Sequence, residues 1–399
     1  MWQRLYRRIP QSNAVKFSIL LPTRNRLDLL KLAVESVRLQ DYADWEIVIS
    51  DNVSSEDVCA YAASLQDARI RCRRTEQLLP VTENWNAALE RSSGDYLIML
   101  GDDDGLMLGC LSAAKALVEE WNYPDAIYTE ACQYAYPGVI PGHAEGFIQF
   151  GYNAFLQGKT RPTSLPRETA LDMVRAAASF RIRYGYNMQH FIFSRKLVES
   201  LRPKGNFFQS PYPDYYAANA ILISATSIVV NPTPLVMIGI SPKSFGFYYY
   251  NDREADGVTF LWNLVSDEIR DRLRGTLVPG SNMNDSWLYA METLAQNFRK
   301  EVPLRVDYGR YRLLQFYAYF RSQSWRGIPA ILRRMHANEI LRYGWLVGAY
   351  LIAYLLPLSW RRRAHESIRS SISAFPRFDL RRRTVPQRDI LEVIRNYQA

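Results

Sequence analysis

Hydrophobic and polar positions in the first 130 residues follow a recurring order: a short apolar run, a polar turn, and then apolar residues at helical spacing. The apolar runs predict β-strands at 15–21, 45–49, 68–72, 96–100 and 126–129. The helical spacing predicts α-helices at 27–39, from Ser54 onward, at 82–91 and at 108–120. Strands that alternate with helices form a mostly parallel sheet flanked by helices. The pattern therefore predicts an α/β fold, with ligands expected at the carboxyl ends of the strands.

The pattern changes after residue 130. Residues 131–165 combine Gly, Pro and aromatic residues without a clear period, which predicts a loop. Helices are expected at 167–179, 195–201 and 215–224, a strand at 189–194, and an edge hairpin over 225–240, where prolines interrupt β-branched residues. From residue 257 onward helical spacing dominates. We therefore predict one domain over residues 1–250 and a mainly helical region over 251–399.

The basic charge is concentrated at one end of the chain. Residues 301–399 contain 18 Arg, no Lys and 7 acidic residues, whereas residues 1–300 contain 31 basic and 33 acidic residues. A segment of this charge typically contacts anionic lipid or nucleic acid. Within it, residues 345–360 carry no charge and are too few for a spanning helix, which needs about 20 apolar residues. Two interpretations stay open: a segment at an anionic membrane surface, and a buried helix of an accessory bundle.

The cysteines are Cys59, Cys72, Cys110 and Cys132, and they lack the paired spacing of metal-binding motifs. We expect them to be reduced, mostly buried thiols of a cytoplasmic protein, without a disulfide framework. The N-terminal residues are basic but lack the apolar stretch of a secretory signal.

Three adjacent carboxylates, Asp102, Asp103 and Asp104, follow the apolar run at 96–100. Carboxylates at the mouth of a buried strand repel one another, and a divalent cation is the simplest way to stabilise them. Oxygen ligands on a short turn favour Mg²⁺ or Mn²⁺, which keep water and substrate phosphates as further ligands. A solvated acidic turn is the alternative, but the apolar strand before the turn favours the metal site.

Two other polar turns follow predicted strands. Asp51 and Asn52 end the second strand, where the carboxylate of Asp51 could accept hydrogen bonds from a base or a ribose. The turn at 22–26 places Arg24 and Arg26 at the end of the first strand, where guanidinium groups suit a diphosphate. Both turns are also common in α/β proteins, so neither is specific by itself.

In combination these segments resemble family 2 inverting glycosyltransferases with the GT-A fold. The motifs are "FSILLPTRNR", "WEIVISDNVSSED", "TENWNAAL" and "GDYLIMLGDDDGL", within residues 17–111, and their order and spacing match those of the family. The resemblance implies a Rossmann-like sheet of GT-A type, with a nucleotide-sugar donor bound across the strand ends and a divalent cation on its diphosphate. It also implies a donor half over residues 15–130 and an acceptor half over 131–250.

The resemblance further implies roles for individual residues. The residues expected to bind the donor are Pro22, Thr23, Arg24, Arg26, Asp51, Asn52, Asn84, Asn86 and Asp102. The metal ligands are expected among Asp102, Asp103 and Asp104. Many relatives have Asp-Ser-Asp-Asp at this turn, and in that register Gly101 replaces the first aspartate, so Asp103 and Asp104 become the preferred ligands.

An inverting transfer needs a base that deprotonates the acceptor hydroxyl. The resemblance implies Asp214, in "SPYPDYYAANA", as that base, and an acid that merely complements a helix N-terminus is the alternative. His190 is a weaker candidate for contact with the metal or the sugar, because an isolated histidine beside aromatic residues is commonly structural. Family habit implies a saccharide or lipid-linked acceptor for a cell-surface polymer, and hence a cytoplasmic protein, peripheral at the inner face of the membrane.

Two other functions are open to comparison. A nucleotidyltransferase would carry a Gly-rich, Lys-containing phosphate loop near its first strand, and residues 22–26 contain neither Gly nor Lys. A nucleic-acid-binding protein would use the Arg-rich tail, but the acidic turns would then be unexplained, because carboxylates repel phosphates when no metal lies between them. Glycosyl transfer accounts for the acidic turns, and no nucleic acid is expected as a partner.

Overall fold

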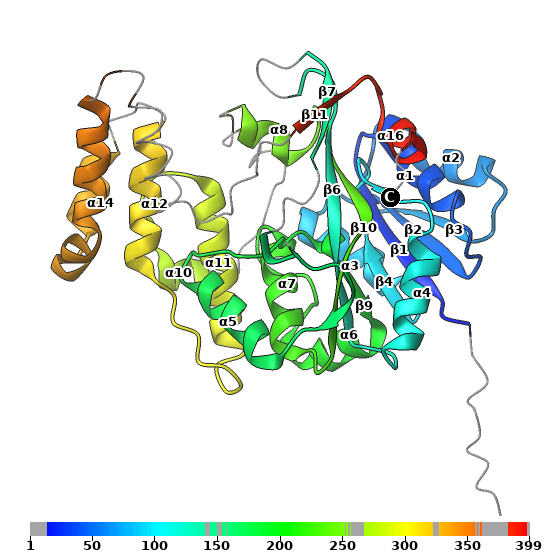
Figure 1. Cartoon of the computed structure of the whole chain (residues 1–399), viewed down its shortest axis with the longest axis horizontal. Helices are drawn as coiled ribbons and strands as arrows, with labels where there is room; N and C mark the ends of the chain where they lie inside the picture. The colour runs from blue at the N-terminus through cyan, green and yellow to red at the C-terminus, as the bar shows by residue number, and fades with distance from the viewer. Residues whose placement is uncertain are drawn as a thin grey trace, which may run out of the picture.

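The computed structural model describes residues 14–139, 144–149, 154–156, 158–251, 253, 256, 267–321, 327–355, 357, 360 and 382–396. Its centre is one eleven-stranded sheet, in which the strands follow the order β11-β7-β6-β9-β4-β1-β2-β3, and β10 pairs with β5, β6 and β8 (Figure 1).

The strands are β1 (Phe17–Thr23), β2 (Trp45–Asp51), β3 (Ile70–Arg74), β4 (Tyr96–Met99), β5 (Gly105–Leu106), β6 (Ala126–Ala135), β7 (Gly146–Gln149), β8 (Thr163–Ser164), β9 (Phe191–Ser194), β10 (Ile228–Ile240) and β11 (Arg382–Val385). The helices are α1 (Leu27–Arg38), α2 (Val58–Ser64), α3 (Val81–Glu90), α4 (Cys110–Glu120), α5 (Arg167–Ala178), α6 (Arg195–Leu201), α7 (Pro213–Ser224), α8 (Phe245–Tyr250), α10 (Asp267–Leu273), α11 (Asn282–Asn297), α12 (Tyr308–Arg321), α13 (Ile328–Arg334), α14 (Ala337–Leu355) and α16 (Ile390–Asn396). Short 3-10 helices are η1 (Ala154–Leu156), η2 (Met188–His190) and η3 (Arg202–Lys204).

The predicted α/β fold is confirmed, and its sheet is mixed. Strands β3, β2, β1 and β4 are parallel neighbours, as the alternation of strands and helices predicts. Strand β9 then lies between β4 and β6 and runs antiparallel to both. Beyond it, β6 and β10 are again parallel. The carboxyl ends of β1, β2 and β4 therefore meet at one edge of the sheet.

Apolar residues cover both faces of this sheet. In β1, Ile19 and Leu21 belong to a core shared with α1 and α4, whereas Leu20 belongs to a core shared with α3, α5 and α7. Side chains of successive strand residues point to opposite faces, so a continuous apolar run is what a strand covered on both faces requires.

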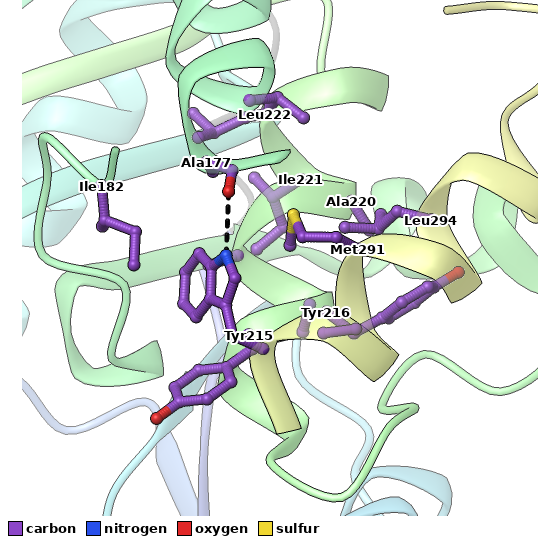
Figure 2. Packing of buried hydrophobic residues seen from close by; sticks show 14 of the residues in the cluster. Ala177, Ile182, Tyr215, Tyr216, Ala220, Ile221, Leu222, Met291 and Leu294 are labelled. Carbon is purple, nitrogen blue, oxygen red and sulfur yellow. Dashed lines mark hydrogen bonds between the residues drawn. The ribbon is translucent and has the colours of Figure 1, made fainter. Parts of the chain in front are cut away.

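Helix α7 is buried almost all round, and it carries Asp214 in its first turn. Tyr215, Tyr216 and Ile221 pack among residues of α11, and Figure 2 shows this layer. The indole of Trp287 in α11 donates a hydrogen bond of 2.9 Å to the carbonyl oxygen of Ala177 in α5. These contacts from two helices fix the position of α7, and with it the start of the helix.

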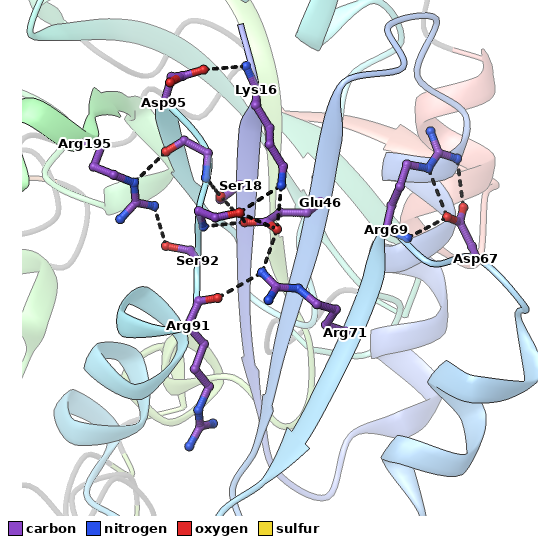
Figure 3. Close-up of polar contacts among 12 residues, drawn as sticks. Lys16, Ser18, Glu46, Asp67, Arg69, Arg71, Arg91, Ser92, Asp95 and Arg195 are labelled. Carbon is purple, nitrogen blue, oxygen red and sulfur yellow. Dashed lines mark hydrogen bonds and ion pairs between the residues drawn. The ribbon is translucent and has the colours of Figure 1, made fainter.

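A polar cluster around Glu46 ties the first strands together near their amino ends (Figure 3). The Glu46 carboxylate accepts hydrogen bonds from Ser18 Oγ at 2.7 Å and from the Ser93 amide at 2.6 Å, and it pairs with Lys16 and Arg71. Burial by itself would raise the pKa of Glu46, but these hydrogen bonds and charges lower it to about 2. The carboxylate is therefore ionised and satisfied, and its role here is structural.

Two predictions for the second half are wrong. Residues 131–165 are not a continuous loop, because β6 extends to Ala135 and β7 and β8 follow. Residues 225–240 do not form an edge hairpin but one long strand, β10, whose register against β6 shifts on either side of Pro234. In both cases the strand is stabilised by a partner distant in the sequence, which local periodicity does not reveal.

The prediction of four reduced cysteines is also wrong in part. Cys59 in α2 and Cys72 in β3 form a disulfide, because the helix packs directly beside the strand that follows it. Cys110 and Cys132 are buried, as predicted, and neither belongs to this disulfide.

The segment from residue 382 to residue 396 returns to the first part of the chain. Strand β11 pairs antiparallel with β7, and the Tyr134 hydroxyl donates a hydrogen bond of 2.8 Å to the carbonyl oxygen of Gln387. Ile390 and Ile394 of α16 are buried in a core shared with Leu29 of α1. Within the predicted helical region over 251–399, β11 and α16 thus pack against the first part of the chain. Within the described residues, no helix combines the length and apolar character that crossing a bilayer requires.

Candidate active site

The acidic turn leaves the sheet at the end of β4 and is enclosed by β10. All three aspartates are buried. Gly239 of β10 lies directly against this turn, since a Cβ placed there would be 1.9 Å from the carbonyl oxygen of Asp103. Only glycine permits such a close approach of two backbones. The three carboxylates are therefore held in a packed environment and do not project into bulk solvent.

Asp104 holds the turn in place. Its Oδ2 accepts hydrogen bonds from the Gly101 amide and from Gln189 Nε2, each at 2.7 Å, and its Oδ1 accepts the Gly239 amide at 2.8 Å. Both oxygens are thus occupied by protein donors. Asp104 acts here as an anchor that joins β4, η2 and β10.

Asp102 connects the acidic turn to the end of β1. Its Oδ2 accepts a hydrogen bond of 2.7 Å from Thr23 Oγ1, and its Oδ1 accepts one of 2.8 Å from Arg26 Nη1. Arg26 also donates to the carbonyl oxygen of Lys243, beyond β10. The structure therefore brings together Thr23, Arg26 and Asp102, three residues predicted to bind the donor.

Asp103 differs from the other two aspartates in the contacts of its carboxylate oxygens. Its Oδ2 accepts a hydrogen bond of 2.8 Å from Ser241 Oγ, while its Oδ1 lies 4.0 Å from Arg26 Nη1 without a hydrogen bond. Burial raises the pKa of Asp103 and of Asp104, and in Asp104 the neighbouring charge of Asp103 adds to the effect. This excess of buried negative charge suits a cation.

The donor set fits a divalent ion held by one carboxylate better than a three-carboxylate cluster. In the described part of the chain, no group of three or more His, Cys, Asp or Glu side chains is arranged to hold an ion. Mg²⁺ and Mn²⁺ commonly use only one or two carboxylates and complete their shell with substrate phosphates and water. Asp103 Oδ1 meets that requirement, whereas the oxygens of Asp102 and Asp104 already have protein partners.

Asp51 and Arg24 lie at the neighbouring strand ends. Asp51 is buried, its Oδ1 accepts the Ser54 amide at 3.0 Å, and its Oδ2 pairs with Arg74 at 3.1 Å. Arg24 follows Pro22 and Thr23 of β1, and its buried Nε lacks a hydrogen-bond partner among the described residues. A buried guanidinium N–H without an acceptor is costly unless a ligand supplies one.

The three predicted asparagines support loops in this structure. Asn52 bonds the backbone of Leu79 through both atoms of its amide, at 2.8 Å each. Asn84 accepts a hydrogen bond of 2.7 Å from Ser50 Oγ, and Asn86 bonds the backbone of Phe208 through both amide atoms. Since these amides are occupied, a direct contact with the donor stays a prediction for all three.

Asp214 is linked to the acidic turn through η2. Its Oδ1 accepts the Met188 amide at 2.7 Å, and the next residue, Gln189, donates to Asp104 at 2.7 Å. Burial raises the pKa of Asp214 to about 7. A carboxyl group with that pKa can take up and release a proton near neutral pH, which is what a general base must do.

His190, the third residue of η2, belongs to the sheet core. Its Nδ1 is 2.9 Å from the Thr129 carbonyl oxygen, and its ring stacks on Tyr128 with centroids 5.6 Å apart. Burial lowers the pKa of His190 to about 4, so the ring is neutral. These contacts agree with the structural interpretation of this residue.

Sequence analysis did not identify the residues that fasten the acidic turn from the second half of the chain. They are Gln189, Gly239 and Ser241. They lie 85 to 138 positions from their aspartate partners, and none belongs to a motif. Only the course of β10 and η2 brings them to the turn.

Comparison with known proteins finds similar sequences for the first third of the chain. Residues 18–143 match the model of a protein family described as glycosyl transferase family 2. A Campylobacter jejuni protein, GalNAc(5)-diNAcBac-PP-undecaprenol beta-1,3-glucosyltransferase, is 38% identical over 108 residues, which cover 26% of this chain and 35% of the relative. An Escherichia coli protein, UDP-Glc:alpha-D-GlcNAc-diphosphoundecaprenol beta-1,3-glucosyltransferase WfgD, is 30% identical over 87 residues, covering 22% of this chain and 34% of the relative.

The matched segment thus spans about a third of the length of these two relatives, as the 35% and 34% shares state. Among solved structures, S. aureus TarS 1-349 in complex with UDP is similar with a TM-score of 0.45 and 13% identity, over 95% of this chain and 87% of that one.

Proposed function

Over residues 18–143 this chain belongs to glycosyl transferase family 2, and on that premise we propose that it is an inverting enzyme that moves a sugar from a nucleotide-diphosphate donor to an acceptor hydroxyl. The family match favours this function over nucleotidyl transfer and over nucleic-acid binding. The observation that carries the proposal is the short link from Asp104 through Gln189 and Met188 to Asp214.

This link joins two chemical functions. The acidic turn lies at the carboxyl end of β4, where α/β sheets bind ligands. Asp214 has a pKa of about 7 because it is buried. Successive residues of η2 bond the two, so a donor at the turn and a base at α7 would have a fixed separation. Transfer reactions depend on such positioning.

At the donor end, Thr23, Arg26 and Asp102 form one hydrogen-bonded group, in which Arg26 is the positive charge nearest the aspartates. We assign the diphosphate to this region and the ribose or base to Asp51. The unpartnered Nε of Arg24 would donate to a phosphate oxygen. Asp103 would hold a Mg²⁺ or Mn²⁺ ion, which when bound supplies positive charge for the departing diphosphate.

At the acceptor end, ionised Asp214 would accept the proton of the acceptor hydroxyl while the oxygen forms its bond to the anomeric carbon. The bond from that carbon to the donor diphosphate breaks on the opposite face, and the configuration inverts. The Met188 amide keeps Oδ1 in place, so the other oxygen of Asp214 is the one that takes the proton.

The names of the relatives suggest substrates. Both are beta-1,3-glucosyltransferases whose names include a diphospho-linked undecaprenol, and one name includes UDP-Glc. We propose a saccharide linked to a polyprenyl diphosphate as the acceptor, for a cell-surface polymer, and UDP-glucose as the first donor to test. Such an acceptor would place the enzyme at the inner face of the membrane as a peripheral protein.

The test is release of UDP from UDP-glucose and a panel of other nucleotide sugars, with Mn²⁺ or Mg²⁺ and with chelator. Asp103→Asn should abolish the dependence of donor affinity on the cation, whereas Asp214→Asn should keep that dependence and lose transfer. Glu120→Gln, at an exposed acid of α4, is the control and should change neither. Donor affinity that is equal with cation and with chelator in the unmodified protein would contradict the assignment of Asp103.

A further inference from the structure

Helix α14 exposes large apolar side chains to solvent. It lies at the outer edge of the molecule beside α12 (Figure 1). Tyr343 and Leu346 are buried, and the Tyr343 hydroxyl donates a hydrogen bond of 2.7 Å to Asp307. Leu341, Trp345 and Ile352 are 84%, 67% and 65% exposed. The helix is therefore fixed by one side and leaves an apolar side uncovered.

The exposed residues form a stripe along one side of the helix. At 3.6 residues per turn, positions 341, 345 and 352 lie within about 40° of one another, and they extend over roughly 16 Å of helix. The buried Tyr343 and Leu346 lie on the opposite side. Isolated exposed apolar residues are ordinary, but a stripe of large ones marks a surface that another apolar phase covers.

Basic residues accompany this stripe in the sequence. Arg333 and Arg334 precede it in α13, Arg342 follows Leu341, and all three are exposed. Arg334 also donates to the Leu277 carbonyl oxygen, and Arg342 lies 3.7 Å from Asp307. The one acid of this segment, Glu339, is turned inward against Arg312. In the sequence, three further arginines follow at 361–363.

We propose that α14 lies in the headgroup layer of an anionic bilayer, with Leu341, Trp345 and Ile352 inserted and the arginines on lipid phosphates. Tryptophan suits this depth because its ring is apolar and its N–H is polar, and arginine adds attraction to anionic lipid. The inference rests on the proposed function, since a polyprenyl-linked acceptor would lie in the same membrane.

A second copy of the chain is the competing occupant, and charge argues against it. A two-fold symmetric contact brings a patch against itself. Here such a contact would place the arginines of both copies in one interface, with Glu339 already paired inside each. Anionic headgroups neutralise the same arginines instead.

The experiment uses the full chain and vesicles of phosphatidylcholine with and without phosphatidylglycerol, and it measures the partition coefficient by flotation. Trp345→Glu and Ile352→Glu should each lower partitioning about tenfold or more. Arg333→Gln should lower it about fivefold, and only on vesicles that contain phosphatidylglycerol. Tyr123→Glu is the control, since Tyr123 is an exposed aromatic residue, 53% accessible, between α4 and β6. It should partition as the unmodified chain does.

Each other outcome overturns the proposal. Equal partitioning of Trp345→Glu and the unmodified chain would do so, as would an unmodified chain that does not float and that sediments as an oligomer which Trp345→Glu dissociates. Thermal unfolding of each variant checks that it is folded. Release of UDP from UDP-glucose should stay unchanged in the α14 variants, so loss of docking is distinguishable from loss of catalysis. An unmodified chain that floats but releases no UDP would refute the proposed function and leave the docking surface intact.

Discussion

Replacing Asp214 by Asn removes the titratable proton of this side chain but keeps the side chain in its position. Its Oδ1 accepts the Met188 amide at 2.7 Å, and an amide oxygen accepts the same hydrogen bond. The volume of the side chain hardly changes. What disappears is a carboxyl group whose pKa burial raises from 3.8 to about 7.

The catalytic consequence depends on ionisation. Ionised Asp214 is the base, so kcat/KM of the unmodified chain should fall about tenfold for each pH unit below 7. Asp214→Asn should lose about 10² to 10⁴ in kcat/KM, the usual contribution of a general base, and should lose the acid limb with it. The assay is the rate of sugar transfer between about pH 5 and pH 8.

Ionisation of Asp214, which catalysis requires, lowers the stability of the folded chain. The pKa of Asp214 is higher in the folded chain, so the folded state holds the proton more tightly than the unfolded state does. This contribution is complete below about pH 4 and is lost as the pH rises through about 7, where the ionised carboxyl costs the fold up to about 4 kcal/mol. The melting temperature of Asp214→Asn should therefore exceed that of the unmodified chain by more at about pH 8 than at about pH 5. A flat rate profile in the unmodified chain, or full activity in the variant, would refute the assignment.

Two further predictions concern hydrogen bonds to buried carboxylates. Gln189→Ala removes one donor from the buried Asp104 carboxylate and should cost about 1–3 kcal/mol in urea unfolding, with weaker binding of UDP-glucose; unchanged values would show that the Gln189 contact is dispensable. Glu46→Gln should destabilise the chain by about 2 kcal/mol at neutral pH, because the carboxylate accepts hydrogen bonds from Ser18 and Ser93. The pKa of Glu46 is lowered to about 2, so its contribution is present above the unfolded value and is lost as the pH falls toward 2. Denaturant titrations at several pH values measure the difference in unfolding free energy between Glu46→Gln and the unmodified chain. A difference that does not change with pH would contradict the prediction.

The first half of the fold could be predicted because its strands are specified locally. The runs that became β1, β2 and β4 are mostly apolar, and each is followed by a polar turn. The second half could not be predicted in the same way. Its strands β6 and β10 pair with each other along ten positions, although they lie far apart in the sequence. Pro234 in the middle of β10 suggests an interrupted strand, yet the bulge at that residue accommodates it.

The site divides in the same way. Thr23, Arg26 and Asp102 follow the ends of predicted strands, and parallel strands bring their carboxyl ends to one edge, so their meeting could be expected. The hydrogen bonds from Gln189 and Gly239 to Asp104 could not be predicted, because they depend on how the second half of the chain folds. Sequence chemistry thus identifies the aspartates as a group, whereas the partners of each carboxylate oxygen depend on three-dimensional contacts.

The return of α16 to the first domain has a consequence for synthesis. A ribosome delivers β1, α1 and β5 long before residues 382–396, yet Ile394 is the side chain that a Cβ at Gly105 would strike, at 2.5 Å. Until those residues emerge, the apolar surface around Leu29 and Met107 lacks the contacts of Ile390 and Ile394. This apolar surface is therefore exposed to aggregation and to chaperones until residues 382–396 have been synthesised.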